Sequence, residues 1–363
     1  MDKKIGFGGE INEKKLLKIG YIGCGSHSRR NILPTFSYVN VKRVAICDLQ
    51  IEKAEVFAKE FGFERCYSNH LEMLSSEELD AVFIVTRNDE KGRPLYCRLA
   101  ADCINAGVDV WMEKPPAAEA FELEALKELS KSKGKQVMIG LKKMFFPANE
   151  KAKELIGDHI NMALLQYPER IPTKEEFDFY FAPNPSNEVE GFLDHICHPA
   201  SLMIFFMGYP KTLQYARSAD GGGVANFTFE NGSIASIALT RNAGRDGGME
   251  RSMLIGENRH VLVDNNIRVS LNRTPPNLQY GASPSYYSGK PEEVTAVWEP
   301  EFSLGQLYNK GIFLLGYYNE INTFCEAILA DRPIMKGNLD DAIMVTKIFK
   351  AFAEGENKLI QIK

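Results

Sequence analysis

The chain has 363 residues, of which 44% are apolar and 25% charged, ordinary values for a globular protein with room for two domains. Its formal net charge is -5, so the chain lacks the excess of positive charge that is typical of nucleic-acid-binding proteins. No apolar run approaches the ~20 residues of a membrane-spanning helix, and residues 1–17 lack the apolar stretch of a signal peptide. We therefore expect a cytoplasmic protein without a membrane or nucleic-acid partner.

Cysteine usage is consistent with that compartment. The seven cysteines are scattered and form no C-x-x-C pair, so neither a zinc ribbon nor a thioredoxin-type site is indicated. Several lie within apolar runs, where free buried thiols are usual. This pattern fits a reducing cytosol.

The first part of the chain alternates strands and helices. Apolar runs predict strands at residues 17–22, 44–48, 81–86 and 136–140, and in the run that ends at Glu113-Lys114-Pro115. Helical spacing predicts helices between them, at residues 29–38, 52–61, 94–106 and 119–132. Strands separated by helices of this length imply a parallel, doubly wound sheet.

A glycine-rich turn follows the first strand and opens a helix. Its Gly23-x-Gly25-x-x-Ser28 pattern departs from G-x-G-x-x-G at the last position, where a small residue allows close packing. Asp48 ends the second strand, where a carboxylate accepts hydrogen bonds from ribose hydroxyls and repels a 2′-phosphate. The context favours a dinucleotide site for NAD, with NADP less favoured. By itself the pattern is also that of a plain strand-to-helix turn with a solvated acid nearby.

The Glu113-Lys114-Pro115 triplet places a lysine at the carboxyl end of a predicted strand. Open α/β sheets bind ligands at that edge. An ammonium group there can meet a reacting oxygen.

The second half has the pattern of an antiparallel sheet. Residues 225–229 and 233–239 flank Asn231-Gly232, a strong hairpin signal. Further strands are predicted at residues 251–256, 261–264 and 267–271, helices at 317–329 and 339–354, and a long loop at 275–300. The expected fold is α/β: an N-terminal Rossmann domain with a doubly wound parallel sheet, and a C-terminal α+β domain with a large, mainly antiparallel sheet. The expected boundaries are an extension at 1–16, the Rossmann domain at 17–141 and the second domain at 142–363.

One short segment of the second domain carries potential chemistry. On a helix, Asp194 and His198 are i and i+4 and share a face, whereas His195 points elsewhere. Histidine suits proton transfer at neutral pH, and an acid one turn away can orient it or bind a substrate hydroxyl. Two other interpretations stay open. Asp194, His195, Cys197 and His198 are all possible metal ligands, or the acid pairs with the histidine for structural reasons alone.

These features occur together in one known family. The matching residues, in chain order, are Gly23-Cys24-Gly25, Asp48, the strand Asp80 to Thr86, Glu113-Lys114-Pro115, Gly140 with Phe145 and Pro147, Asp194-x-x-x-His198, and the closing segment Gly316 to Pro333. From Leu17 onward the chain resembles the glucose–fructose oxidoreductase, inositol dehydrogenase and rhizopine catabolism (Gfo/Idh/MocA) family, whose members oxidise or reduce ring hydroxyls of sugars, nucleotide sugars or cyclitols with NAD or NADP.

The resemblance implies an NAD-dependent oxidoreductase acting on a carbohydrate or cyclitol. Lys114, Asp194 and His198 would be catalytic, with no metal. We expect His198 to be the base, Lys114 to stabilise the developing oxyanion, and Asp194 to hold a neighbouring hydroxyl and the His198 tautomer; Lys114 could instead be the acid and base itself. Residues expected to bind the cofactor are Gly23, Gly25, Ser26, His27, Ser28, Asp48, Thr86, Arg87, Asn88, Glu113 and Lys114. A homodimer or homotetramer, formed through the exposed face of the second sheet, is also implied.

The chain departs from the family pattern around the expected nicotinamide and substrate pockets. The departures are Ser28 for the third glycine, a longer loop at 86–94 with Tyr96 where a histidine is usual, Met144 for an arginine, and Ser201 for an acid. They leave the substrate open. Two other functions of the same fold remain as alternatives: an NAD-dependent glycosidase that oxidises its sugar transiently, and a dinucleotide sensor without turnover.

Overall fold

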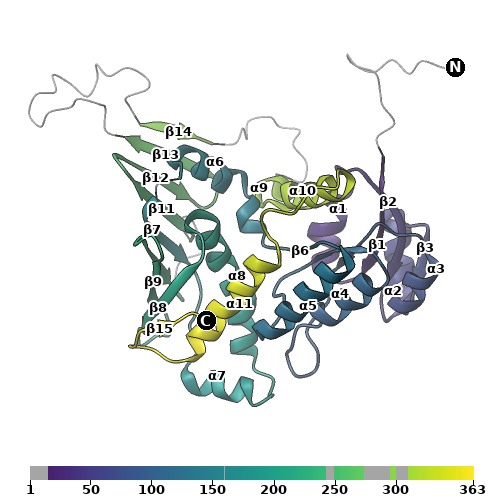
Figure 1. Cartoon of the computed structure of the whole chain (residues 1–363), viewed down its shortest axis with the longest axis horizontal. Coiled ribbons are helices and arrows are strands. Elements are labelled where there is room, and N and C mark those ends of the chain that lie inside the picture. The colour runs from purple at the N-terminus through teal and green to yellow at the C-terminus, as the bar shows by residue number, and fades with distance from the viewer. Residues whose placement is uncertain (1–14, 159, 243–248, 274–294, 300–309) are drawn as a thin grey trace, which may run out of the picture.

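A computed structural model describes residues 15–158, 160–242, 249–273, 295–299 and 310–363. Two sheets lie on opposite sides of the molecule, with helices α8 (Asn187–Met207) and α11 (Leu339–Ala353) between them (Figure 1). The expected fold class, a parallel sheet followed by a mainly antiparallel one, is confirmed. No helix in the described ranges has the length and apolar character needed to cross a bilayer.

The first sheet has six parallel strands in the order β3-β2-β1-β4-β5-β6. They are β1 (Leu17–Ile22), β2 (Val41–Cys47), β3 (Arg65–Tyr67), β4 (Ala81–Ile84), β5 (Asp109–Met112) and β6 (Val137–Ile139). Chain order reverses between β1 and β4, which is where doubly wound sheets open a ligand crevice. Ile22, Cys47, Ile84 and Met112 lie in register across four strands. The residues that follow them therefore emerge at one edge.

Helices cover both faces of this sheet. They are α1 (Leu33–Thr35), α2 (Ile51–Phe61), α3 (His70–Ser76), α4 (Tyr96–Asn105) and α5 (Ala120–Lys133). The helix predicted at 29–38 is shorter than expected and opens with a π-helical turn, Ser28–Ile32, in which Leu33 N–H donates to Ser28 O. Pro34 offers no N–H to an α-helical ladder, which is consistent with this wider turn.

The second sheet has nine strands in the order β14-β13-β12-β11-β7-β10-β9-β8-β15, antiparallel except for β7 with β10. They are β7 (Ile160–Tyr167), β8 (Pro210–Arg217), β9 (Gly223–Phe229), β10 (Ile234–Leu239), β11 (Arg251–Gly256), β12 (Arg259–Asp264), β13 (Arg268–Arg273), β14 (Ala296–Trp298) and β15 (Ile360–Gln361). The hairpin predicted at Asn231-Gly232 is confirmed by the pairing of β9 with β10. The loop predicted at 275–300 lies mostly outside the described residues, and the prediction is wrong at β14, which pairs with β13.

One face of the second sheet is covered by helices and the other is open. The remaining helices are α6 (Pro147–Ile156), α7 (Lys174–Phe181), α9 (Lys310–Leu314) and α10 (Tyr317–Leu329), besides α8 and α11. Met162, Leu164, Val224 and Ile234 are 37–45% exposed on the open face. The homodimer or homotetramer expected through this face stays a prediction.

Helix α10 packs on the first sheet although it follows the second in the chain. Phe324 of α10 is fully buried, with its ring centroid 5.4 Å from that of Phe83 in β4. Next to it, Asn40 donates to Glu326 of α10. Farther on, Ile139 N–H of β6 donates to Gly337 O. The C-terminal segment therefore ties the two sheets together.

This packing predicts a large stability loss for Phe324→Ala. Removing a fully buried aromatic ring costs about 3–5 kcal/mol of unfolding free energy. The control is Phe121→Ala on α5, where the side chain is 65% exposed, with a change within about 0.5 kcal/mol. Urea unfolding of both variants checks this, and a loss for Phe324→Ala no greater than that of the control contradicts the assignment of α10 to the core.

Candidate active site

The glycine turn sits at the carboxyl edge of the first sheet. Gly23 has φ +106°, a conformation that suits glycine, and its N–H donates to Cys47 O at 2.8 Å. A Cβ on Gly23 would lie 1.9 Å from Val85 O, whereas one on Gly25 would meet no atom within 4 Å. Gly23 therefore closes the turn against β4, and Gly25 leaves an open approach to the backbone.

Ser28 takes the place of the third glycine in a different way from that expected. Its side chain is fully buried, and its hydroxyl donates to Gly23 O at 2.7 Å. Ser28 therefore fixes the shape of the turn, and its expected contact with the cofactor stays a prediction. Ser26, by contrast, is exposed next to Gly25.

Asp48 is held at the same edge by backbone donors. Its Oδ2 accepts from Cys24 N–H at 2.8 Å and its Oδ1 from Gln50 N–H at 3.0 Å. Each carboxylate oxygen keeps a lone pair for a ribose hydroxyl. Arg29 and Arg30 are the nearby cations that could meet a 2′-phosphate, and Arg29 is engaged with Glu60 at 3.0 Å. This arrangement fits NAD.

The loop after β4 is anchored on both domains. Tyr96, where the family has a histidine, donates its hydroxyl to Thr86 O at 2.7 Å and is buried. Asn88 donates to Glu190 of α8 at 3.4 Å. Arg93 stacks 3.6 Å above the ring centroid of Tyr180 in α7. Arg87, a further expected cofactor residue, is exposed on this loop.

Glu113 and His27 bind each other below the crevice. Glu113 is buried, and its Oε1 lies 2.9 Å from His27 Nε2, while Asn31 Nδ2 lies 3.1 Å from His27 Nδ1. Burial favours a higher pKa for Glu113, but the His27 hydrogen bond and the charges of Lys114 and Lys142 bring its pKa below the ordinary value. Glu113 is therefore a carboxylate that supports the lysine beside it.

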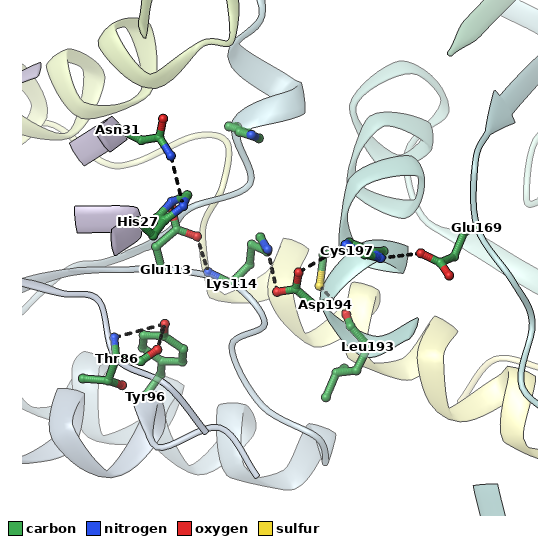
Figure 2. Close-up of polar contacts among 12 residues, drawn as sticks. His27, Asn31, Thr86, Tyr96, Glu113, Lys114, Glu169, Leu193, Asp194 and Cys197 are labelled. Carbon is green, nitrogen blue, oxygen red and sulfur yellow. Dashed lines mark hydrogen bonds and ion pairs between the residues drawn. The ribbon is translucent and has the colours of Figure 1, made fainter. Parts of the chain in front are cut away.

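Lys114 bridges the two domains (Figure 2). Its Nζ lies 2.5 Å from Oδ1 of Asp194 on α8, and its side chain is only 13% exposed. Burial alone would lower the pKa of Lys114, but the charges of Asp194 and Glu113 raise it above the ordinary value. The lysine is thus an ammonium group held at the mouth of the crevice.

His198 lies on the same face of α8 as Asp194, as predicted. It does not, however, pair with Asp194. It is buried, and burial followed by the charge of Lys114 lowers its pKa well below the ordinary value, so the ring is neutral near pH 7. Within the described residues Asp194 contacts Lys114 and His195, and not His198. The prediction that Asp194 holds the His198 tautomer is therefore wrong, because the lysine takes that carboxylate.

The sequence analysis gave His195 no role in catalysis and missed Glu169. His195 Nδ1 is hydrogen-bonded to Glu169, and its Nε2 lies 3.7 Å from Asp194 Oδ2. The hydrogen bond that Glu169 accepts raises the pKa of His195, although burial opposes this shift. Its position next to Asp194 was the available signal, but Glu169 is 26 residues away in the chain.

The metal-site interpretation of this segment has no support in its geometry. Cys197 Sγ donates to Leu193 O at 3.2 Å, while Asp194 and His195 turn to Lys114 and Glu169. Across the described part of the chain, no group of three or more His, Cys, Asp or Glu side chains is placed to hold a metal ion.

A cavity of about 290 Å³ opens beside His198. It is lined by Lys142, Lys143, Phe146, Tyr167, His198, Met249, Glu250, Asn265, Asn266 and Leu315. Lys142 and Lys143 come from the 3-10 turn Lys142–Phe145 that joins the two domains. The cavity therefore belongs to the second domain and meets the first at its lysine wall.

Taken together, the edge of the first sheet fits a dinucleotide. Gly23 and Gly25 give a tight turn with an open backbone, Asp48 presents fixed carboxylate oxygens, and Thr86 Oγ1 is buried without a hydrogen-bond partner in the described structure. The backbone beside Gly25 would hold a pyrophosphate and Asp48 the adenosine ribose. The roles of the individual side chains in binding stay predictions.

Comparison with known proteins identifies the first domain. Residues 17–141 match the oxidoreductase family with an NAD-binding Rossmann fold, which confirms the resemblance noted in the sequence. The chain is 27% identical over 237 residues to D-apiose dehydrogenase of Paraburkholderia graminis, and 25% identical over 211 residues to D-xylose 1-dehydrogenase (NADP(+)) 2 of Haloferax volcanii. These matches cover 63% and 56% of this chain and 59% and 61% of the relatives.

The fold of the whole chain is also known. The crystal structure of myo-inositol 2-dehydrogenase from Lactobacillus plantarum superposes with a TM-score of 0.68 at 23% identity, covering 96% of this chain and 100% of that one. This likeness concerns the fold of both domains.

Alanine substitutions at Gly23 and Gly25 should have separable effects on stability and on NADH affinity. Gly23→Ala forces a Cβ onto Val85 O and a positive φ on alanine, so it destabilises the fold. Gly25→Ala meets no atom, so unfolding free energy changes by less than about 0.5 kcal/mol. Its methyl group instead obstructs a bound pyrophosphate, and we expect NADH affinity to fall at least about tenfold. Calorimetric titration with NADH checks this, and unchanged affinity would mean that the dinucleotide does not approach this turn.

Burial of neutral His198 predicts a pH-dependent stability. Its folded-state pKa lies below the unfolded value near 6.5, so its contribution is present above that pH and is lost as pH falls toward the folded pKa. The slope is at most about 1.4 kcal/mol per pH unit. Urea unfolding between about pH 5 and pH 8 should show a shallower decline for His198→Asn than for the wild type. Parallel curves for the two proteins would refute the buried neutral state.

Proposed function

Since residues 17–141 form the NAD-binding domain of the Gfo/Idh/MocA oxidoreductase family, we propose that the chain is an NAD-dependent dehydrogenase that interconverts a ring hydroxyl and a ketone on a sugar, sugar derivative or cyclitol. The observation that carries the proposal is the placement of Lys114. Its ammonium group lies at the same sheet edge as the glycine turn, contacts Asp194 at 2.5 Å and is close enough to buried His198 to lower the pKa of that ring.

The reaction requires two transfers from the substrate. A hydride leaves the carbon and a proton leaves its hydroxyl, and NAD supplies the hydride acceptor, or the donor in the reverse direction. The protein must therefore remove the proton and stabilise the oxyanion while the carbonyl forms.

His198 is the proposed base. Its lowered pKa keeps a ring nitrogen free to accept the hydroxyl proton at neutral pH. Lys114 is poorly suited to that task in oxidation, because Asp194 and Glu113 raise its pKa and keep it protonated. As an ammonium group it stabilises negative charge on the reacting oxygen, and in reduction it holds a proton near the carbonyl oxygen.

Asp194 has two proposed roles. It holds Lys114 at the carboxyl edge of β5 and keeps it charged. Its second oxygen, 3.7 Å from His195 Nε2, can accept a hydrogen bond from a neighbouring substrate hydroxyl.

Replacing Lys114 should separate chemistry from binding. Lys114→Met keeps the apolar stem but removes the charge, so turnover should fall roughly a hundred- to ten-thousandfold. NADH affinity should hold, since the glycine turn and Asp48 lie elsewhere on the edge. Lys127→Met is the matched control, because Lys127 pairs with Asp340 on the surface. The assay is NAD reduction with a panel of sugars, sugar acids, nucleotide sugars and cyclitols.

Two outcomes would contradict the proposal. Near-normal turnover in Lys114→Met would remove the lysine from the chemistry. Consumption of glycosides without accumulation of NADH would identify a transient-oxidation glycosidase, and cofactor binding without turnover of any substrate would identify a sensor.

A further inference from the structure

Lys142 is a partly buried ammonium group in the wall of the 290 Å³ cavity. Its Nζ donates to Tyr317 OH at 2.8 Å and lies 4.6 Å from the centroid of that ring. Burial lowers its pKa to about 8, with Glu113 opposing this shift and Lys143 and Lys114 adding to it. At pH 7 the side chain is therefore mostly charged, and a neutral hydroxyl is its hydrogen-bonded partner.

The other two lysines of the site already have carboxylate partners. Lys114 pairs with Asp194, and Lys143 pairs with Glu250. Glu250 Oε2 accepts from both Lys143 and Asn266, the latter at 3.0 Å. Within the described residues, Lys142 is the one of the three without a carboxylate in ion-pair contact.

Two further acids lie nearby, and neither compensates Lys142 by contact. Both oxygens of Glu113 are taken, Oε1 by His27 and Oε2 by Lys114 N–H. Glu320 is completely buried, and neither of its oxygens finds a hydrogen-bond partner in the described structure. Burial raises its pKa well above the ordinary value, so it is uncharged.

A partly buried charge without a close counter-ion is incompletely solvated, and a bound anion would supply the missing partner. We propose that the substrate carries an anionic oxygen group, a carboxylate or a phosphate, and that Lys142 binds it in the cavity beside His198. This inference rests on the proposed function and adds the class of substrate: a sugar acid or sugar phosphate. Asn265 and Asn266 line the same cavity and offer polar contacts to the ring.

The affinities of matched ligand pairs test the proposal, and this measurement does not require turnover. The pairs are D-glucuronate with D-glucuronamide, D-galacturonate with D-galacturonamide, and glucose 6-phosphate with glucose. We expect at least one anion to bind the NADH-saturated protein about ten- to a hundredfold more tightly than its neutral counterpart, the range for a charge-assisted hydrogen bond. A preference within a uronate pair indicates a carboxylate site, and a preference for glucose 6-phosphate over glucose indicates a phosphate site. Dissociation constants come from calorimetry or ligand-observed NMR.

Variants locate the effect on Lys142. Lys142→Gln should abolish the preference for the anion while NADH affinity stays unchanged. Lys151→Gln removes one positive charge from the surface, where Lys151 pairs with Glu154, and should keep the preference. If Lys142→Gln does not fold, the wild-type comparison of anion with amide still decides.

The pH dependence provides an independent measurement. The charged and titratable groups of the described residues that face Lys142 or share its cavity are Glu113, Lys114, Lys143, Tyr167, Tyr317, Glu320, His198 and Glu250. Since the pKa of Lys142 is about 8, the preference for the anion should weaken between about pH 7 and pH 9, and affinity for the neutral partner should change little.

The outcomes are distinct from those of the proposed function. If the wild type binds the anion and its neutral counterpart equally in every pair, the anion site is overturned. The same holds if it binds none of the probes. An equal preference in wild type and Lys142→Gln also overturns it. If anions bind through Lys142 and none is oxidised with NAD, the anion site stands and the proposed oxidation fails for these substrates.

Discussion

The contact between Lys114 and Asp194 is the interaction on which the site depends. Lys114 leaves the carboxyl end of β5 in the first sheet, and Asp194 projects from α8 of the second domain. A short ion pair between partly buried groups has a strict geometry, because any separation leaves each charge poorly solvated. The pair therefore links the sheet that carries the glycine turn to the domain that contains the cavity beside His198.

Charges around this pair produce two groups with opposite tasks. Glu113 and Asp194 keep Lys114 protonated, and the lysines together with burial keep His198 neutral. The same surroundings thus support an ammonium group at Lys114 and an unprotonated imidazole at His198. Pairs of groups whose surroundings push their pKa values apart are typical of acid–base sites.

Departures from the family pattern are accommodated by contacts within the fold. The hydroxyl of Ser28 satisfies the Gly23 carbonyl where glycine would leave space. The Tyr96 hydroxyl donates to Thr86 O at the start of the longer loop, and Arg93 of that loop stacks on Tyr180 of the second domain. These substitutions alter the walls of the crevice and leave the Lys114, Asp194 and His198 constellation in place.

The sequence by itself determined the local elements and the chemistry at the sheet edge. Alternating apolar runs and helical spacing predicted the parallel sheet, and strand ends predicted that Gly23, Asp48 and Lys114 share one edge. That inference works because parallel strands end together, as the register of Ile22, Cys47 and Met112 confirms. The sequence analysis missed β7, whose partners β10 and β11 are distant in the chain. It also missed β8, although β8 pairs with the neighbouring strand β9.

Only the tertiary structure decided which side chains pair. Helical spacing alone predicts that Asp194 contacts His198, because residues i and i+4 of a helix share a face. The lysine from the other domain approaches that face and takes the carboxylate, since an opposite charge outcompetes a neutral ring. Glu169 beside His195 and Lys142 without a carboxylate are likewise products of chain segments brought together by folding. Burial, which sets the protonation of each group, exists only once those segments have packed.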